Sequence, residues 1–114
     1  MQPIFTETRP WGEFRQFTTG TPVTVKVLLV KAGERISLQQ HEKRSEFWRV
    51  LSGAPLITIG TETFQAAKGD EIEVPVRTLH RIEATDTDVE ILEISEGTFN
   101  EADISRIDDN YGRA

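Results

Sequence analysis

The chain has 114 residues, of which 37% are hydrophobic and 28% are charged, and its formal net charge is -6. This length predicts one globular domain, residues 1–114, because two hydrophobic cores need a longer chain. An acidic chain without a block of Lys or Arg is a poor candidate for binding nucleic acid or a membrane, and we expect neither as a partner. The chain contains no cysteine, which excludes disulfides and thiolate metal sites. Its N-terminus lacks the pattern of a signal peptide, so we expect a cytoplasmic protein.

Strand-like alternation runs through most of the chain. In residues 23–30, Val and Leu side chains at the odd positions share one face, opposite Thr24, Lys26, Leu28 and Val30. Further strands are predicted over 36–39, 46–51, 56–59, 71–74 and 89–94, separated by turns rich in Gly, Pro and Asp. Short strands at roughly ten-residue spacing favour an all-β sandwich or barrel. Near the C-terminus, Asn100 as an N-cap predicts a short helical turn over 101–107.

Four polar residues are spaced so that they can meet at one metal ion. Gln39 and His41 lie two apart on a predicted strand, which places both side chains on one face with Cα atoms roughly 6–7 Å apart. Glu46 follows a polar bend over 42–45, and His80 follows a separate turn over 75–79. Each residue alone has a structural interpretation, such as a hydrogen-bonded histidine or a solvated carboxylate. Together they predict a metal centre formed by Gln39, His41, Glu46 and His80.

The same residues carry a resemblance to a known family. The order Gly33, Gln39, His41, Glu46, Gly53 and then Gly69, Pro75, His80 resembles the two cupin motifs. The flanking segments are 9–12 (Arg-Pro-Trp-Gly), 38–41 (Leu-Gln-Gln-His), 44–48 (Arg-Ser-Glu-Phe-Trp) and 108–113 (Asp-Asp-Asn-Tyr-Gly-Arg). They are similar to the type II mannose-6-phosphate isomerase domain, which also follows the nucleotidyltransferase in bifunctional mannose-1-phosphate guanylyltransferases. The resemblance implies a cupin double-stranded β-helix, and we expect a stand-alone domain because the chain has no room for the nucleotidyltransferase.

The chain also departs from the family's pattern near the predicted ligands. Lys43 and Phe47 stand where the family usually has histidines, and Arg77 and Ala84 replace a Gly and an Asn. None of these changes removes one of the four predicted ligands. Phe has no hydrogen-bonding group, so we expect Phe47 to make the pocket drier and narrower.

The resemblance implies isomerisation of mannose 6-phosphate to fructose 6-phosphate at one divalent ion. Mixed nitrogen and oxygen ligands suit Zn, Mn, Fe, Co or Ni and do not select among them. The ion would stabilise the enediolate formed as a proton moves between two carbons, with Glu46 as its only charged ligand. Lys26 is the candidate base by position, although an exposed strand lysine is the alternative.

The sugar phosphate needs cations to hold it. Arg44 and Arg106, which match family positions, and Lys43 are the candidates, and a solvated loop charge is the alternative for Lys43. Trp11 and Trp48 are expected to pack in the core or at the barrel mouth.

Two other functions and one assembly stay open at this point. The chain can be a non-catalytic or differently catalytic cupin that binds a metal and a sugar, sugar phosphate or small acid, an alternative that Lys43 and Phe47 favour. An iron-dependent oxygenase uses similar ligands. Small cupins commonly associate through sheet edges, so we expect a homodimer in which residues 1–8 reach over the partner.

Overall fold

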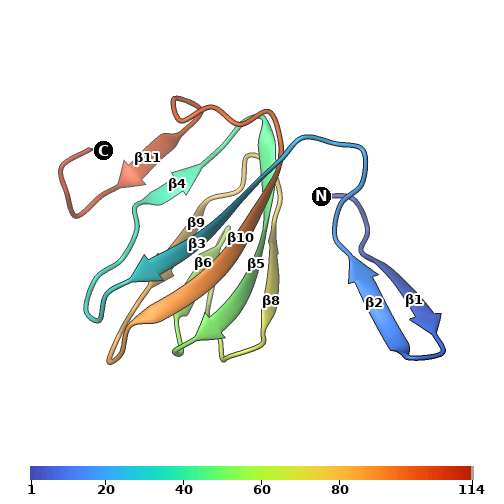
Figure 1. The fold of residues 1–114 in the computed structure, drawn as a ribbon. Coiled ribbons are helices and arrows are strands. Elements are labelled where there is room, and N and C mark those ends of the chain that lie inside the picture. The colour runs from blue at the N-terminus through green and yellow to red at the C-terminus, as the bar shows by residue number, and fades with distance from the viewer. Residues whose placement is uncertain (114) are drawn as a thin grey trace.

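Residues 1–113, which the computed structural model describes, form eleven β-strands (Figure 1). Ala114, the last residue of the predicted domain, lies outside the described residues. The strands are β1 (Phe5–Arg9), β2 (Gly12–Gln16), β3 (Val23–Val30), β4 (Leu38–Gln40), β5 (Arg44–Ser52), β6 (Leu56–Ile59), β7 (Glu62–Gln65), β8 (Glu71–Val74), β9 (His80–Glu83), β10 (Val89–Gly97) and β11 (Ser105–Asp108). Across the described residues there is no helix long and apolar enough to cross a bilayer.

Two antiparallel sheets pack face to face and enclose one core. Their strand orders are β3-β10-β5-β8 and β11-β4-β9-β6-β7. Trp48 and Ile91 contribute to the core from the first sheet, and Ile57 and Ile82 contribute from the second. All four side chains are fully buried. The prediction of an all-β barrel is therefore confirmed.

The central strand β5 explains how polar residues reach the interior. Successive side chains point to opposite faces, so Glu46 and Trp48 face inward together while Phe47 faces outward. The Phe47 ring packs on Phe17 with 5.0 Å between ring centroids. The expectation that Phe47 narrows the inner pocket is therefore wrong, because alternation along the strand turns this ring to the outer face.

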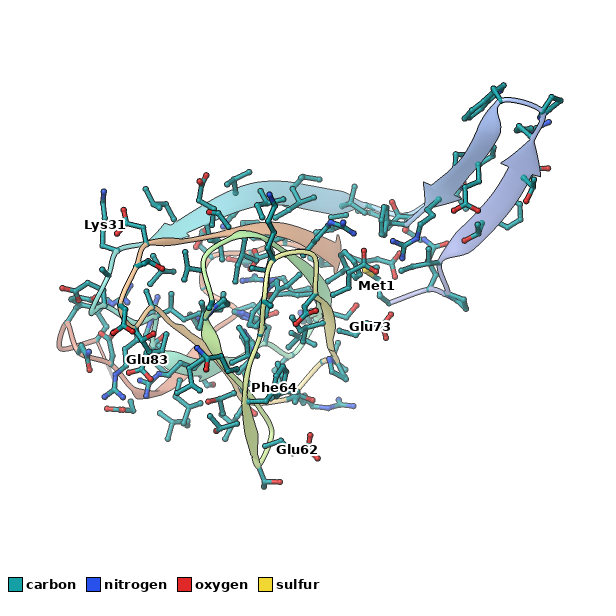
Figure 2. The ribbon with its side chains drawn as sticks, turned by 90° about the horizontal axis from the view of Figure 1, so that it is seen from below. Met1, Lys31, Glu62, Phe64, Glu73 and Glu83 are labelled. Carbon is teal, nitrogen blue, oxygen red and sulfur yellow. The ribbon has the colours of Figure 1, made fainter. Side chains whose placement is uncertain are left out.

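The chain begins with a hairpin that the sequence did not predict. β1 and β2 form a separate two-stranded sheet with the turn at Pro10 and Trp11. This hairpin projects away from the barrel (Figures 1 and 2). Trp11 at its turn is 73% exposed, so the expected packing of Trp11 is wrong, whereas Trp48 is buried as predicted.

The predicted helical turn over 101–107 is also wrong. The side chain of Asn100 does accept a hydrogen bond from the Ala102 N–H, at 2.9 Å, as an N-cap would. Only a turn follows, because the next residues join β11 and pair with β4, placing Arg106 opposite Gln39. Tertiary strand pairing thus overrides the local helix signal.

Candidate metal centre

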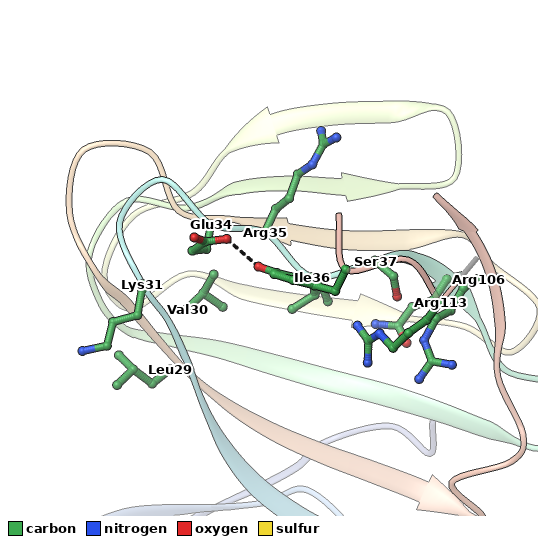
Figure 3. Close-up of a pocket in the computed structure, with 11 residues that line it drawn as sticks. Leu29, Val30, Lys31, Glu34, Arg35, Ile36, Ser37, Arg106 and Arg113 are labelled. Atoms are coloured by element: carbon green, nitrogen blue, oxygen red, sulfur yellow. Dashed lines mark hydrogen bonds between the residues drawn. The ribbon is translucent and has the colours of Figure 1, made fainter. Parts of the chain in front are cut away.

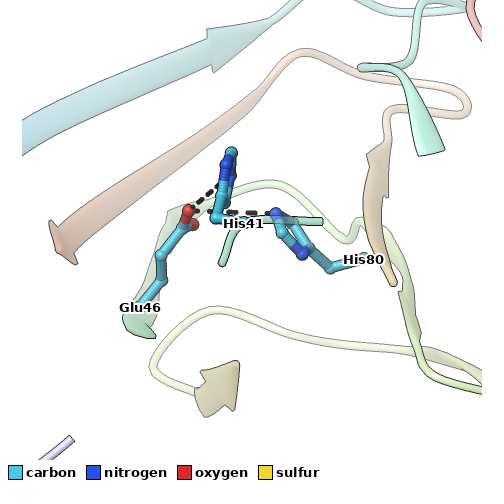
Figure 4. Close-up of side chains that lie close together, drawn as sticks. All are labelled: His41, Glu46 and His80. Carbon is cyan, nitrogen blue, oxygen red and sulfur yellow. Dashed lines mark ion pairs between the residues drawn. The ribbon is translucent and has the colours of Figure 1, made fainter. Parts of the chain in front are cut away.

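Three buried side chains converge between the two sheets (Figure 4). His41 directly follows β4, and His80 begins β9, whose neighbour in the sheet is β4. Glu46 reaches toward both histidines from β5 in the opposite sheet. Strands far apart in the sequence therefore position one imidazole–carboxylate cluster.

The ligand atoms of this cluster are close enough to share one ion. The Nε2 atom of His41 lies 3.0 Å from Oε1 of Glu46, and the Nε2 atom of His80 lies 3.8 Å from the same oxygen. One ligand atom from each residue can be chosen so that all lie within 4.8 Å of one another. The side chains are 4%, 3% and 2% exposed for His41, Glu46 and His80, respectively. The cluster is thus withdrawn from solvent.

Backbone carbonyls fix which nitrogen of each histidine carries the proton. Nδ1 of His41 lies 2.6 Å from the carbonyl oxygen of Asp103, and Nδ1 of His80 lies 2.9 Å from that of Thr78. A carbonyl only accepts hydrogen bonds, so each Nδ1 is the donor and each neutral ring presents an Nε2 lone pair to Glu46. Burial lowers the pKa of His80 below its ordinary value, which favours this neutral form. Three electron-pair donors facing one another fit a bound cation.

Gln39 lines the same pocket as these three residues. It is the cross-strand partner of His80, which brings the two backbones side by side. The structure therefore gathers all four predicted ligands around one cavity of about 170 Å³. A set of one amide, two imidazoles and one carboxylate lining the same cavity suits divalent Zn, Mn, Fe, Co or Ni, so the residues present fit one such ion.

Glu93 is a pocket residue that the sequence analysis missed. Nε1 of the buried Trp48 donates to Oε2 of Glu46 and to Oε2 of Glu93, both at 3.1 Å. A signal was available, because Val89, Ile91 and Glu93 share the inward face of β10. A glutamate continuing an apolar inward face is a candidate for a buried functional group.

The pKa values of Glu46 and Glu93 are shifted in opposite directions. Burial favours the neutral form of both. For Glu46, interactions with His41, Glu93 and His80 together outweigh burial and lower its pKa to about 2. For Glu93, burial followed by the charge of Glu46 raises the pKa to about 8. Glu46 is therefore the charged ligand candidate, and Glu93 is a neutral acid that donates to it.

Two arginines and a lysine also line this cavity: Lys26, Arg44 and Arg106. One terminal nitrogen of Arg44 lies 3.3 Å from Nε2 of His41, and its Nε atom has no hydrogen-bond partner. Nε of Arg106 is likewise buried without a partner. Buried donors without acceptors indicate room for an anionic ligand.

Lys26 enters the cavity from β3. Its Nζ lies 3.4 Å from the Glu101 carboxylate and 4.6 Å from the centre of the Phe99 ring. Glu93 is its cross-strand partner on β10. Lys43, in contrast, is exposed in the bend and does not line the cavity, while its backbone N–H donates to Asp103. Of the three predicted phosphate contacts, the structure thus brings together Arg44 and Arg106.

Figure 3 shows a larger cavity of about 360 Å³. It shares Gln39 and Arg106 with the first cavity. Its other arginines already have acidic partners. Arg113 makes two hydrogen bonds to the Asp109 carboxylate, and Arg35 lies 3.4 Å from Asp108. Arg106 lines both cavities. Among the described residues it has no acidic partner.

Two facing antiparallel sheets with a buried cluster of two histidines and one glutamate define a cupin-type barrel with a candidate metal centre. A solved cupin protein from Bacteroides fragilis superposes with a TM-score of 0.62 at 25% identity, over 68% of each chain. The chain belongs to the family described as "Mannose-6-phosphate isomerase C-terminal", whose model matches residues 3–109.

Relatives in this family are larger proteins. The alginate biosynthesis protein AlgA of Pseudomonas aeruginosa is 36% identical over 107 residues, which are 92% of this chain and 22% of AlgA. The mannose-1-phosphate guanylyltransferase RfbM of Salmonella typhimurium is 34% identical over 106 residues, 91% of this chain and 22% of RfbM. The chain thus spans less than a quarter of these relatives' length.

Proposed function

We propose that the chain is a metal-dependent sugar-phosphate isomerase domain that converts mannose 6-phosphate to fructose 6-phosphate. The observation that carries the proposal is the convergence of two Nε2 lone pairs and one buried carboxylate on a pocket that Arg44 and Arg106 also line, each with a buried Nε that makes no hydrogen bond. The family membership supports the substrate class. Gln39, His41, Glu46 and His80 would hold the ion.

A divalent ion held by these four residues would supply Lewis acidity for a carbonyl and its neighbouring hydroxyl. The chain's own residues orient the sugar and move the proton. We assign the proton transfer to Lys26, whose amine faces the cavity from the strand beside Glu93. Glu46 supplies the negative charge of the centre, and its hydrogen bond from Trp48 holds it in place.

The phosphate is assigned to Arg44 and Arg106. The guanidinium group pairs with phosphate through two parallel hydrogen bonds. Both arginines have a buried Nε that makes no hydrogen bond, and that of Arg44 lies 3.7 Å from the Glu46 carboxylate. Arg106 lies where the smaller cavity meets the larger one. A sugar with its reactive carbons near the histidines can therefore extend its phosphate toward Arg106.

The activity test uses the purified chain, stripped by a chelator and reloaded separately with zinc, manganese, iron, cobalt or nickel. Fructose 6-phosphate is measured after incubation with mannose 6-phosphate. The Lys26→Met variant should lose roughly 10²- to 10⁴-fold in kcat, as expected for loss of a proton-transfer group. Lys68→Met, which removes a lysine from an exposed turn, is the matched control and should keep full activity. No turnover with any of these metals sinks the isomerase assignment.

A second readout separates the phosphate contacts from the proton transfer. Arg106→Met should raise KM about tenfold or more, since a lost charge-assisted hydrogen bond costs roughly 1.4 kcal/mol or more. Its kcat should change less than that of Lys26→Met. An unchanged KM would remove Arg106 from the phosphate site while leaving the isomerase assignment in place.

Metal binding is tested independently of turnover. Elemental analysis should find one ion per wild-type chain and a large loss in the double variant His41→Ala/His80→Ala. Equal, tightly bound metal in both proteins would show that the site is elsewhere. Metal binding without isomerase activity would favour the non-catalytic cupin, and oxygen consumption with iron and an organic substrate would favour an oxygenase.

A further inference from the structure

Interconversion of an aldose and a ketose moves two hydrogens, and Lys26 is one proton-transfer group. One hydrogen leaves C2 and is replaced by one on C1, while another passes from the oxygen on C2 to the oxygen on C1. Each transfer needs an acid–base group within hydrogen-bond reach of the reacting atoms. A second such group in the metal cavity would divide the two transfers with Lys26.

Three glutamates line the metal cavity, namely Glu46, Glu93 and Glu101. Glu46 belongs to the ligand cluster, where its carboxylate faces two imidazoles. Glu93 is held through both oxygens, which accept hydrogen bonds from Trp48 at 3.1 Å and from Ser95 at 3.5 Å. Glu101 is the cavity carboxylate that neither the ligand cluster nor this buried network engages.

Glu101 forms an ion pair with the lysine that lines the same cavity. Nζ of Lys26 lies 3.4 Å from Oε1 of Glu101. The two residues come from distant parts of the chain, since Lys26 lies on β3 and Glu101 lies in the turn between β10 and β11. A carboxylate in contact with an ammonium group places one base and one acid side by side.

The turn that carries Glu101 is attached to the cavity wall on both sides, although the Glu101 side chain is 79% exposed. Before it, the centre of the Phe99 ring lies 4.6 Å from Nζ of Lys26. After it, the carboxylate of Asp103 accepts hydrogen bonds from two backbone N–H groups of the bend over 42–45, at 2.9 and 3.0 Å. The Glu101 carboxylate is therefore open to water but carried on a positioned backbone, as a proton-transfer group requires.

We propose that Glu101 is the carbon base of the isomerisation and that Lys26 carries the oxygen proton. The inference rests on the proposed isomerase function. In the first step the Glu101 carboxylate takes the proton from C2, and the electrons of that C–H bond form a double bond between C1 and C2. The Lys26 ammonium group gives a proton to the carbonyl oxygen on C1. The product of this step is the neutral enediol.

The second step returns both side chains to their starting forms. The Lys26 amine takes the proton from the oxygen on C2, which becomes the carbonyl oxygen of the ketose. The electrons of the C1–C2 double bond take the proton of the Glu101 carboxyl group onto C1. One hydrogen has then moved between carbons and one between oxygens, with no oxidant or reductant. The ion pair between Lys26 and Glu101 is the form that starts each turnover.

The exposure of Glu101 predicts the fate of the carbon-bound hydrogen. A proton on an exposed carboxyl group exchanges with water before it is returned to the sugar. Fructose 6-phosphate formed from mannose 6-phosphate in heavy water should therefore carry deuterium at C1, which nuclear magnetic resonance detects. Product without deuterium at C1 would indicate a base sealed from water or a hydride shift, and it would overturn the proposal.

Substitutions at Glu101 test the same assignment. Glu101→Gln should lower kcat roughly 10²- to 10⁴-fold and change KM much less, as expected for loss of a proton-transfer group. Elemental analysis should find the same metal content as in wild type, because Glu101 is not one of the four predicted ligands. Glu101→Asp, which keeps a carboxylate, should recover part of the lost rate. Glu62→Gln, a matched change at an exposed position on β7, should keep full activity.

The outcomes separate this inference from the function on which it rests. An active wild-type chain whose Glu101→Gln variant keeps its kcat would overturn the role of Glu101 and leave the isomerase assignment in place. Equal rates for the Asp and Gln variants, or a loss of rate matched by a loss of metal, would likewise overturn that role. A wild-type chain without turnover would overturn the proposed function and this inference together.

Discussion

Replacing Trp48 with Phe tests how the buried glutamates are held. The indole N–H of Trp48 donates to one oxygen of Glu46 and one of Glu93, both at 3.1 Å, and the side chain is wholly buried. Phe fills most of the same space but has no donor. Losing a hydrogen bond to a charged group and part of a buried ring should together cost roughly 2–4 kcal/mol of unfolding free energy.

The pH dependence of this loss distinguishes the hydrogen bond from packing. Burial raises the pKa of Glu93 to about 8 in the folded chain. The neutral carboxyl group therefore stabilises the folded state fully below the pKa of the unfolded chain. This stabilisation is lost as the pH rises through about 8. Without the indole N–H, which favours the charged form, the pKa of Glu93 rises further. The difference in unfolding free energy between wild type and Trp48→Phe should therefore be constant below pH 7 and grow above pH 8. It should grow by about 1.4 kcal/mol for each unit by which the substitution raises the pKa of Glu93.

Urea unfolding followed by far-UV circular dichroism, in chelator and at one protein concentration, measures this difference. The same substitution in a Glu93→Gln background is the control, because Gln does not titrate and the packing cost of the lost indole ring is common to both. In that background the cost of Trp48→Phe should not change between pH 6 and pH 9. Equal pH dependence in both backgrounds would refute the proposed linkage.

Three further predictions concern the backbone, the N-terminal hairpin and the metal. Gly97→Ala should cost about 3 kcal/mol or more in urea unfolding, because the new Cβ would lie 2.5 Å from the Lys43 carbonyl oxygen at a φ of +117°. The hydrogen bond from Arg15 lowers the pKa of Glu71, so its stabilisation is present above pH 4.5 and is lost as pH falls through the folded pKa. The stability difference between wild type and Glu71→Gln should therefore shrink on acidification, and a constant difference would contradict this ion pair. A metal at 100 times its dissociation constant should add about 2.7 kcal/mol to the unfolding free energy of wild type, and much less to that of Glu46→Gln.

The sequence predicted the barrel because its strands alternate and its turns carry Gly, Pro and Asp. It also identified His41, Glu46 and His80, since the spacing of the histidines and the glutamate resembles a family motif whose order survives in this chain. Their mutual distances depend on two sheets packing together, which no local pattern specifies. The spacing of Gln39 and His41 predicts that both side chains share one face, and both residues line the same cavity.

The error over residues 101–107 has a physical cause, which is that a local signal competes with a long-range contact. Asn100 forms the cap-like hydrogen bond expected of it, but pairing with β4 extends the following residues. Phe47 follows a glutamate that points inward, and alternation alone would have assigned it to the outer face. Trp11 is predicted to pack in the core or at the barrel mouth, yet it is exposed at the turn of the N-terminal hairpin. Lys43 lies next to Arg44 in sequence, but only Arg44 lines the cavity.

The orientation of the His41 ring depends on its hydrogen bond to the Asp103 carbonyl. That carbonyl accepts from His41, 62 positions earlier, and the Asp103 carboxylate accepts from the backbone N–H groups of Glu42 and Lys43. All four predicted ligands precede residue 81, yet the imidazole of His41 acquires its orientation only when the segment around Asp103 has docked. During synthesis, an emerging chain therefore holds the complete ligand set before it holds an ordered site. Ion binding and closure of the last segment are expected to occur as one event, with the ion gaining its full affinity late in folding.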